Sequence, residues 1–363
     1  MKDLIDIIDL SKEEIDELVH TALDIKANPE KYSEKCKGKK LATLFYEPST
    51  RTRLSFTAAM MELGGEVLGF AGASNSSAAK GESVADTVKV ISYFADIIAM
   101  RTEREGAALV AKNNASIPII NGGDGGHCHP TQTLADLVTI YSEKGSFDNL
   151  TVGVCGDLKY GRTVHSLLNA LTRYKNIKVV LISPEELRIP SYVKEEILIK
   201  NNIPFKETFS LEDSIPELDV LYMTRIQRER FLDKDEYERL KDSYVLTVEK
   251  LEKAKEDLCV MHPLPRVNEI SVKVDDDKRA CYFKQVEYGK FIRMALILKF
   301  LEEAKKNPQR EDLFNDDELI VDKYVCDNPK CITVTEQELP QRFKRINEHK
   351  CRCIYCEKEK ELS

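Results

Sequence analysis

The chain has 363 residues, of which 42% are hydrophobic and 32% charged, so it can bury an ordinary globular core and wholesale disorder is not expected. Its 54 Lys and Arg against 62 Asp and Glu give a formal charge of −8, which argues against a general binder of nucleic acids or anionic membranes. The N-terminus lacks an apolar stretch of signal-peptide length, and no run of 18 apolar residues occurs. We therefore expect a soluble cytoplasmic protein with reduced cysteines.

Short apolar runs alternate with helical patterns through the first 150 residues. An amphipathic helix is predicted to start after Ser11, where Glu14 completes a capping box, and to end near Asn28. Strands are then predicted over 41–46, 66–70, 96–100 and 117–121, with a helix over 51–63. Strands that alternate with helices are typical of a parallel α/β sheet.

A second series of the same kind begins at Thr151. Strands are predicted over 152–155, 177–183, 219–223 and 258–261, with a helix over 162–174. We therefore predict two parallel-sheet α/β domains, 1–135 and 136–304, with a helix over 130–144 bridging them. A closing helix over 288–304 should pack back on the first domain. A charged linker over 305–318 should lead to a small β-rich, zinc-binding module over 319–363.

The segment from Glu47 to Arg53 lies between a predicted strand and the start of a helix. Unpaired N–H groups and the helix dipole favour an anion there. Hydroxyls of Ser49, Thr50 and Thr52 and the guanidinium of Arg51 are suited to phosphate. The alternative is that Ser49 or Thr50 only caps the helix.

The segment from Asn121 to Gln132 contains four glycines, which permit close approach of a ligand. His129 and Gln132 should lie on one face at the start of the next helix, where a histidine can donate to a carbonyl oxygen. His127, Cys128 and His129 also suggest a metal site. We disfavour that interpretation because adjacent residues do not easily point at one ion.

Three further loops follow predicted strands of the second domain, and each carries polar or rigid residues. Arg162 begins a helix after the loop from Gly156, which lacks the spacing of a dinucleotide site. Arg225 and Gln227 alternate with Ile226, so in extended chain both side chains face one side, and two prolines stiffen the segment from His262 to Arg266.

In the first domain, a small polar loop near Ser76 carries the cation Lys80. The motifs contain no Ser-His-Asp or Cys-His arrangement. Their cations, hydroxyls and histidine are suited to stabilising an oxyanion without a covalent intermediate.

Together these motifs resemble the aspartate carbamoyltransferase family. The resemblance covers residues 1 to about 304 and rests on Ser-Thr-Arg-Thr-Arg at 49–53, His-Pro-Thr-Gln at 129–132, the stretch 156–166, Thr-Arg-Ile-Gln at 224–227 and His-Pro-Leu-Pro-Arg at 262–266. It implies transfer of a carbamoyl group from carbamoyl phosphate to L-aspartate in pyrimidine biosynthesis. It also implies a homotrimer, or a dimer of trimers, with active sites shared between chains. Ala79 replaces a second loop lysine of the family, and His127 and Cys128 replace polar amides.

The resemblance assigns most of the carbamoyl phosphate site to the first domain. The phosphate would be cradled by Ser49, Thr50, Arg51 and Thr52. The carbonyl oxygen would be held by Thr52, Arg101 and His129, and the amide by Gln132 with the backbone carbonyls of Pro263 and Leu264.

The resemblance assigns the aspartate carboxylates to Arg162, Arg225 and Gln227. Ser76 and Lys80 would arrive from the neighbouring chain, with Lys80 contacting both substrates. An ornithine carbamoyltransferase is the main rival within this chemistry, but an arginine at 225 would repel the ornithine ammonium. A catalytically dead scaffold built around the zinc module is the rival from another class.

Two close cysteine pairs occur near the C-terminus, Cys326 with Cys331 and Cys353 with Cys356. Two such pairs are typical of a structural zinc site, with Cys351 as a fifth candidate ligand. The segment resembles the zinc domain of the aspartate carbamoyltransferase regulatory chain. The nucleotide-binding domain of that chain has no room here. We therefore expect the module to join or brace trimers, and we expect no organic cofactor, nucleic acid or membrane partner.

Overall fold

The computed structural model describes residues 2–75, 77–226, 235, 238, 244–309, 318–336 and 338–362. The chain divides into two compact units. The first comprises residues 1–131 and 290–363, and the second comprises residues 132–289. The predicted site residues Ser76 and Gln227 lie outside the described residues.

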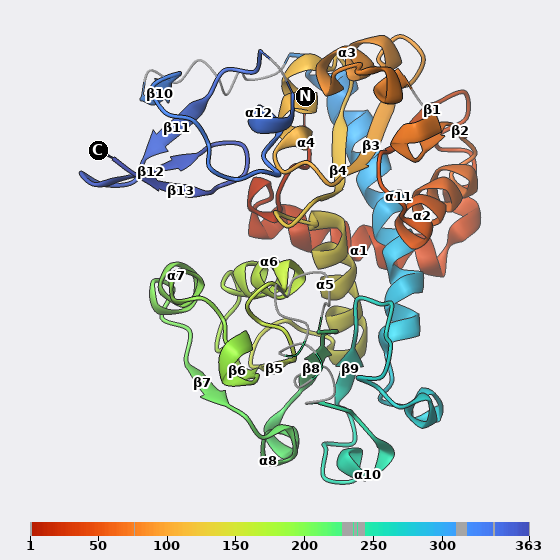
Figure 1. Cartoon of the computed structure of the whole chain (residues 1–363). Helices are drawn as coiled ribbons and strands as arrows, with labels where there is room; N and C mark the ends of the chain where they lie inside the picture. The colour runs from red at the N-terminus through yellow and green to blue at the C-terminus, as the bar shows by residue number, and fades with distance from the viewer. Residues whose placement is uncertain are drawn as a thin grey trace. The chain divides into compact units, whose positions relative to one another are not determined.

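The first unit is built around a four-stranded parallel sheet in the order β2-β1-β3-β4 (Figure 1). Its strands are β1 (Lys40–Phe45), β2 (Glu66–Ala71), β3 (Ile97–Thr102) and β4 (Ile119–Asp124). Five of the six residues of β1 are buried, as expected of a strand covered on both faces. The helices of this part of the chain are η1 (Ile7–Asp9), α1 (Lys12–Ala27), η2 (Pro29–Lys31), α2 (Thr50–Glu62), η3 (Ala73–Asn75), η4 (Ser77–Lys80), α3 (Val84–Ile91) and α4 (Ala107–Asn114).

The second unit holds a five-stranded parallel sheet in the order β7-β6-β5-β8-β9. Its strands are β5 (Thr151–Cys155), β6 (Lys178–Ile182), β7 (Phe205–Thr208), β8 (Val220–Met223) and β9 (Cys259–Met261). The helical segments that go with it are α5 (Pro130–Lys144), α6 (Arg162–Leu171), η5 (Glu185–Leu187), α7 (Ser191–Val193), η6 (Lys194–Ile199), α8 (Leu211–Ser214), η7 (Ile215–Glu217), α10 (Val248–Leu251) and η9 (Val272–Asp276). The predicted alternation of strands and helices is confirmed.

Strand β7 and the start of helix α11 differ from the sequence prediction. Strand β7 was not predicted because it is a sheet edge without a buried residue, and its central Lys206 and Glu207 are exposed. Helix α11 (Tyr282–Lys306) begins six residues before the predicted start at 288. Its first turns mix polar and apolar residues, which hides the helical period. Because α11 crosses residue 290, it passes from the second unit into the first.

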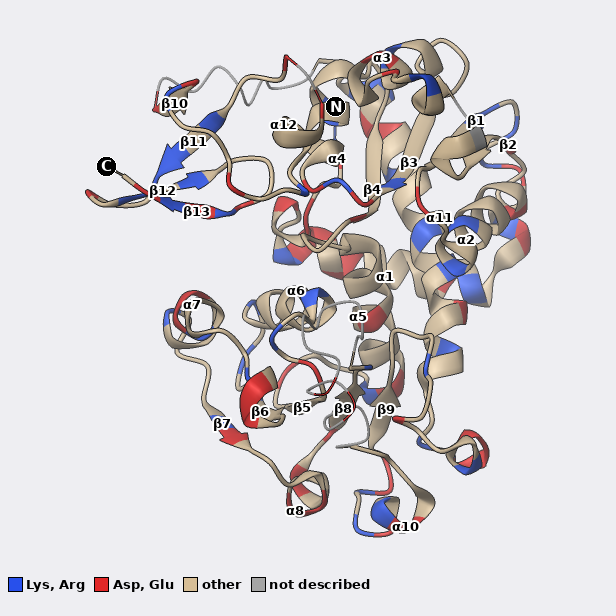
Figure 2. Ribbon diagram, in the orientation of Figure 1, with Lys and Arg blue, Asp and Glu red and all other residues tan. Residues whose placement is uncertain are grey.

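The C-terminal module is a four-stranded antiparallel sheet in the order β10-β11-β12-β13, with the short helix α12 (Ile332–Thr335). The strands are β10 (Leu319–Val321), β11 (Arg342–Arg345), β12 (Lys350–Cys353) and β13 (Glu359–Glu361). Figure 2 shows basic residues on β11 and β12 and acidic ones on β13. Glu359 pairs with Arg352 at 2.9 Å and Lys350 at 3.3 Å, so local charges of opposite sign offset each other.

This module packs on the parallel-sheet part of the same unit. Glu105 N–H donates to the Lys330 carbonyl, and Ile332 N–H donates to the Glu105 carbonyl, both at 2.9 Å. A Cβ at Gly106 would lie 2.5 Å from Tyr355 Cβ, and Gly106 has φ +85°, so glycine permits this close approach. Residues of α4 and of the module share one buried apolar cluster.

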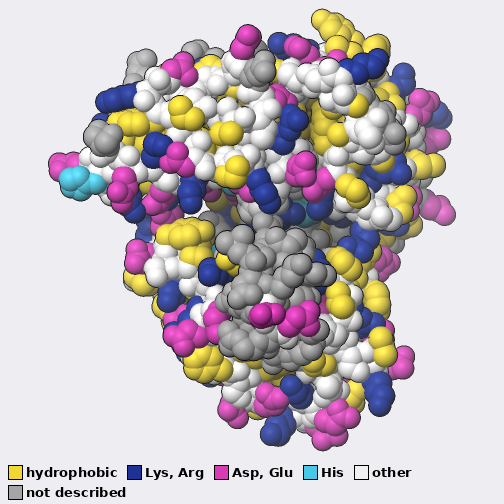
Figure 3. Space-filling model, in the orientation of Figure 1, with side chains coloured by type: hydrophobic (Ala, Val, Ile, Leu, Met, Phe, Trp, Pro, Cys, Tyr) yellow, Lys and Arg dark blue, Asp and Glu magenta, His cyan; other side chains and the backbone are white. Residues whose placement is uncertain are grey.

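On the face drawn in Figure 3, apolar side chains are interspersed with charged ones. Among the helices that the structure describes, none is long and apolar enough to cross a membrane.

Candidate active site and metal centre

The loop after β1 leads directly into α2, and Ser49 occupies the N-cap position. Within the described contacts, the Ser49 side chain makes no capping bond to the helix, so its hydroxyl is not used in the way a simple cap would use it. Arg51 lies in the first turn and is exposed, while Thr52 is buried. Burial and the positive charge of Arg101 lower the pKa of Arg51. Two guanidinium groups thus act on one region, which suits a multiply charged anion.

Arg101, near the end of β3, is the centre of the polar group in the first unit. Its Nη1 lies 3.5 Å from Thr52 Oγ1 and 3.3 Å from His129 Nε2. His129 is only 7% exposed. The structure therefore brings together the three residues predicted to hold the carbonyl oxygen.

Glu47 is a residue of this group that sequence reasoning did not single out. Its Oε1 accepts a hydrogen bond of 2.6 Å from Arg101 Nε, which fixes the plane of the guanidinium and leaves its Nη1 directed at Thr52 and His129. The available signal was an acidic residue beginning a loop that otherwise carries cations and hydroxyls.

Gly123 lies beside this group with φ +123°, a backbone conformation in which a residue with a side chain would be strained. A Cβ there would lie 3.5 Å from Arg101 Nη1 and 3.6 Å from the His129 ring, which are ordinary contact distances. The backbone conformation, not lack of space, therefore favours glycine at this position.

In the second unit, Gln132 is held by a buried chain of hydrogen bonds. Asp136 Oδ1 accepts from Gln132 Nε2 at 2.8 Å and from Gln285 Nε2 at 2.6 Å. Gln285 Oε1 in turn accepts from the backbone N–H of His262 at 3.0 Å. This chain connects Gln132 to the segment that contains Pro263 and Leu264, the other predicted amide-binding groups.

The His262 ring holds that segment from its other side. Leu264 N–H donates to His262 Nδ1 at 2.8 Å, and His262 Nε2 lies 2.7 Å from Glu269 Oε1. Burial alone would raise the pKa of Glu269, but bonds from His262 and the Val267 N–H lower it. The charged Glu269 therefore favours the tautomer with the proton on Nε2, and that tautomer leaves Nδ1 free to accept from Leu264.

We expect the substitution Gln285→Leu to loosen this arrangement. It leaves the buried Asp136 carboxylate and the His262 N–H each short of a partner, at a cost of about 1–3 kcal/mol per group. Urea unfolding should show the loss of stability, and KM for carbamoyl phosphate should rise. Lys284→Leu, which removes an exposed pair with Glu143 at 3.1 Å, is the neighbouring control. An unchanged KM in Gln285→Leu would contradict the positioning role.

The two predicted aspartate-binding arginines that are described both follow strands of the second sheet. Arg162 is the first residue of α6, and Arg225 follows β8. Because β5 and β8 are parallel neighbours, the loops that follow them lie side by side at the carboxyl end of the strands. Thr224 Oγ1 ties these loops together, since it accepts from Asp157 N–H and donates to the Cys155 carbonyl, both at 3.0 Å.

Lys80 is exposed at the end of η4 in the first unit. Its predicted neighbour in the site, Ser76, is outside the described residues. An exposed lysine on a surface loop is compatible with the predicted delivery to a neighbouring chain.

Four buried cysteines of the C-terminal module gather in one place, Cys326, Cys331, Cys353 and Cys356. Their sulfurs all lie within 4.8 Å of one another, with 3.5 Å from Cys326 to Cys356 and 3.9 Å from Cys331 to Cys353. Tetrahedral zinc with Zn–S bonds of about 2.3 Å requires sulfur separations of about 3.8 Å. The cluster therefore fits zinc. Cys351 lies on the same strand as Cys353 but does not belong to this group.

Comparisons with known proteins agree with this organisation. Three family models match, namely the aspartate/ornithine carbamoyltransferase carbamoyl-P binding domain over residues 2–142, the Asp/Orn binding domain over 148–300, and the metal binding domain of the aspartate carbamoyltransferase regulatory chain over 318–362.

Curated relatives include the aspartate carbamoyltransferase catalytic subunits of Lachnoclostridium phytofermentans, 62% identical over 301 residues, and Clostridium novyi, 63% identical over 300 residues. Each match covers 83% of this chain and 98% of the relative.

Solved structures include the catalytic subunit of M. jannaschii aspartate transcarbamoylase, with 49% identity and a TM-score of 0.79 over 85% of this chain and all of that chain. The Trypanosoma cruzi enzyme in complex with N-(phosphonacetyl)-L-aspartic acid has 39% identity and a TM-score of 0.77, and the match covers 82% of this chain and 95% of that one. Together with the site geometry, these matches show that the chain belongs to the aspartate carbamoyltransferase family and carries a regulatory-chain metal binding domain at its C-terminus.

Proposed function

We propose that this chain transfers the carbamoyl group of carbamoyl phosphate to the amine of L-aspartate, and that residues of both units carry the transfer. The main support for this proposal is that Arg101, Thr52 and His129 lie together in the first unit. Arg101 and the Thr52 hydroxyl donate to the carbonyl oxygen and stabilise its negative charge as the amine attacks. His129 Nε2, which accepts from Arg101 Nη1 in the structure, donates to the same oxygen when the substrate replaces that contact and Nε2 carries the proton.

The remaining carbamoyl phosphate contacts come from two parts of the chain. The N-terminus of α2, with Ser49, Thr50 and Arg51, binds the phosphate. Gln132 and the carbonyls of Pro263 and Leu264 hold the carbamoyl amide, which orients the carbonyl carbon toward the incoming amine. Phosphate, as it leaves, accepts the proton that the amine loses.

The aspartate carboxylates are bound by Arg162, Arg225 and Gln227. Arginine forms bidentate pairs with carboxylates and disfavours a cationic substrate tail. Formation of carbamoyl-aspartate, measured colorimetrically with ornithine as the competing substrate, tests this assignment. Product from ornithine at a comparable rate would contradict it, and no product from either substrate would favour the dead scaffold.

The domain roles follow from these assignments. Residues 1–135 form the carbamoyl phosphate domain and 136–304 the aspartate domain, with 305–318 as a linker to the zinc module at 319–363. Ten cysteines that are all free in the structure support the proposed cytoplasmic location.

We further propose that the chain acts as a trimer, or as a dimer of trimers, in which Ser76 and Lys80 complete the site of a neighbouring chain. The exposure of Lys80 supports this, because the side chain is available to another protomer. The zinc module, which docks on residues 104–106 of its own chain, braces this assembly.

Complementation tests the shared site. Lys80→Ala and Arg51→Ala should each be nearly inactive alone. When the two variants are co-expressed, each mixed trimer regains one intact site, so about a quarter of wild-type activity should return. Each variant co-expressed with itself is the control. Absence of recovery in isolated mixed trimers would show that Arg51 and Lys80 serve the same chain's site.

A further inference from the structure

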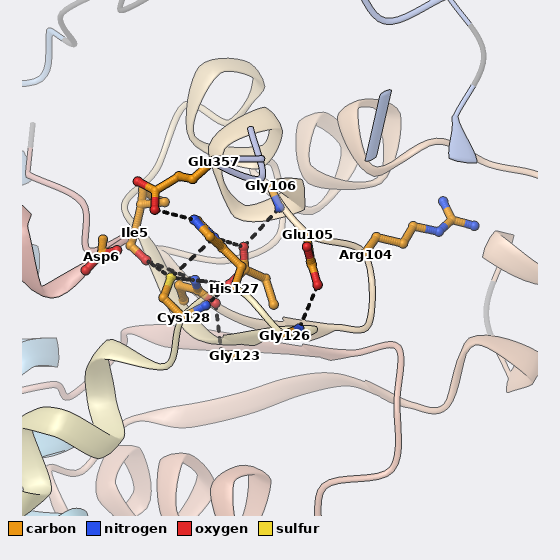
Figure 4. A network of polar contacts seen from close by, with 12 residues as sticks. Ile5, Asp6, Arg104, Glu105, Gly106, Gly123, Gly126, His127, Cys128 and Glu357 are labelled. Carbon is orange, nitrogen blue, oxygen red and sulfur yellow. Dashed lines mark hydrogen bonds and ion pairs between the residues drawn. The ribbon is translucent and has the colours of Figure 1, made fainter. Parts of the chain in front are cut away.

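A second group of side chains that could bind a metal ion lies outside the active site and the four-cysteine cluster. Asp6, just before η1, meets His127 and Cys128 of the loop between β4 and α5, and one donor atom of each lies within 4.8 Å of the others. Figure 4 shows these residues gathered with Glu357. His129 does not take part, since its Nε2 faces Arg101. The adjacent residues His127 and Cys128 thus face each other, contrary to the sequence expectation.

The distances within this group suit a metal ion. His127 Nδ1 lies 3.6 Å from Cys128 Sγ. Zinc bonds of about 2.0 Å to nitrogen and 2.3 Å to sulfur place these two atoms about 3.5 Å apart in a tetrahedron. Asp124 Oδ2 lies 2.9 Å from the same nitrogen, and Asp124 Oδ1 lies 3.3 Å from the sulfur. Asp124 thus pairs with the imidazole and accepts from the thiol, so it holds these two side chains together at the edge of the group without belonging to it.

The surroundings of the imidazole also match a metal-binding histidine. Its Nε2 is buried without a hydrogen bond in the described structure and lies 3.7 Å from Glu357 Oε2. A carboxylate near the far nitrogen is the usual outer partner of a ligating histidine. The near nitrogen, Nδ1, is paired with Asp124 Oδ2 at 2.9 Å, and a bound metal ion would replace this pairing.

The charges of the group favour a cation as well. Asp6, Asp124 and Glu357 surround the single His127, and Asp124 and Cys128 are completely or almost completely buried. A divalent ion would compensate the negative charges that gather here.

We propose that Asp6, His127 and Cys128 form a second metal site, separate from the four-cysteine cluster. The thiolate, imidazole and carboxylate donors select Zn²⁺ over Mg²⁺ or Ca²⁺. Binding forms a metal–sulfur and a metal–nitrogen bond, and the Cys128 thiol proton and the second imidazole proton of His127 leave to solvent. The ion joins the N-terminal segment to the loop that precedes His129.

Metal content of the full-length chain, purified without a polyhistidine tag, tests this site. After saturation with Zn²⁺ and removal of the excess by gel filtration, the wild-type chain should hold two zinc ions, and Cys128→Ser should hold one. Cys351→Ser, a buried thiol outside both clusters, should still hold two. Asp6→Asn keeps a residue that caps a helix well, and it should weaken retention of the second ion only.

Cobalt provides a readout that does not depend on activity or on the folding of one variant. Co²⁺ in the second site should increase the thiolate-to-metal charge-transfer absorbance above that of the four-cysteine cluster. Cys128→Ser should lose this increment, and Cys351→Ser should keep it. A single zinc per wild-type chain, or two zinc ions in Cys128→Ser, would overturn the proposal.

Discussion

Replacing Arg101 with alanine should reduce kcat by about 100- to 1,000-fold, the usual cost of losing one preorganised donor to a developing oxyanion. Arg101 lies within hydrogen-bond reach of Thr52 and His129, so its removal also leaves these two side chains less well positioned. Steady-state kinetics with both substrates varied measures the effect, and the loss should lie mainly in kcat.

Arg104→Ala is the matched control, because Arg104 lies three residues further along the chain and pairs with Glu336 of the zinc module at 2.8 Å. It should retain most of the activity. Arg101→Lys should remain impaired, since a lysine ammonium cannot hold Glu47 and reach Thr52 at the same time. Activity in Arg101→Ala close to that of the wild type would refute the assigned role.

Removal of zinc from the four-cysteine cluster should unfold the C-terminal module. The module is small, and structural zinc contributes about 10–16 kcal/mol to folding of comparable domains. Chelation or Cys331→Ser should therefore expose residues 318–362 to limited proteolysis while the two parallel sheets remain folded. Mass spectrometry of the fragments and zinc content measure the two effects.

Cys351→Ser distinguishes the proposed ligand set from its alternative. Cys351 is buried on β12 but lies outside the four-sulfur group, so this variant should keep zinc at the cluster and resist proteolysis. A module that stays protected after complete loss of zinc would contradict the structural role of the ion.

The order of elements could be predicted from the sequence because strands buried on both faces are short apolar runs, and helices end at recognisable signals. Helix α5 has the predicted bounds, Pro130–Lys144, since Pro130 starts it and Gly145 ends it. Strand β7 could not be predicted because it is a half-exposed edge strand and lacks a run of apolar residues.

The candidate site could be predicted only in part. Its motif residues could be identified from the sequence, and the residues that position them could not. The residues proposed to bind phosphate and carboxylates lie in loops after strands, so short motifs point to them. The residues that position these side chains were not predicted. Asp136 and Gln285 are 149 residues apart in the sequence, and Glu47 and Arg101 are 54 residues apart. A local sequence pattern does not reveal contacts between residues so far apart in the chain.

By itself, the sequence determined the family, the two α/β domains and the paired cysteines, and it proposed the phosphate- and carboxylate-binding side chains, because each depends on residue type and short spacing. Only the tertiary structure decided which side chains orient them, that Asp6 meets His127 and Cys128, and that the zinc module packs on Glu105 and Gly106 of its own chain. These contacts join segments whose proximity depends on strand order and packing, which local periodicity does not encode.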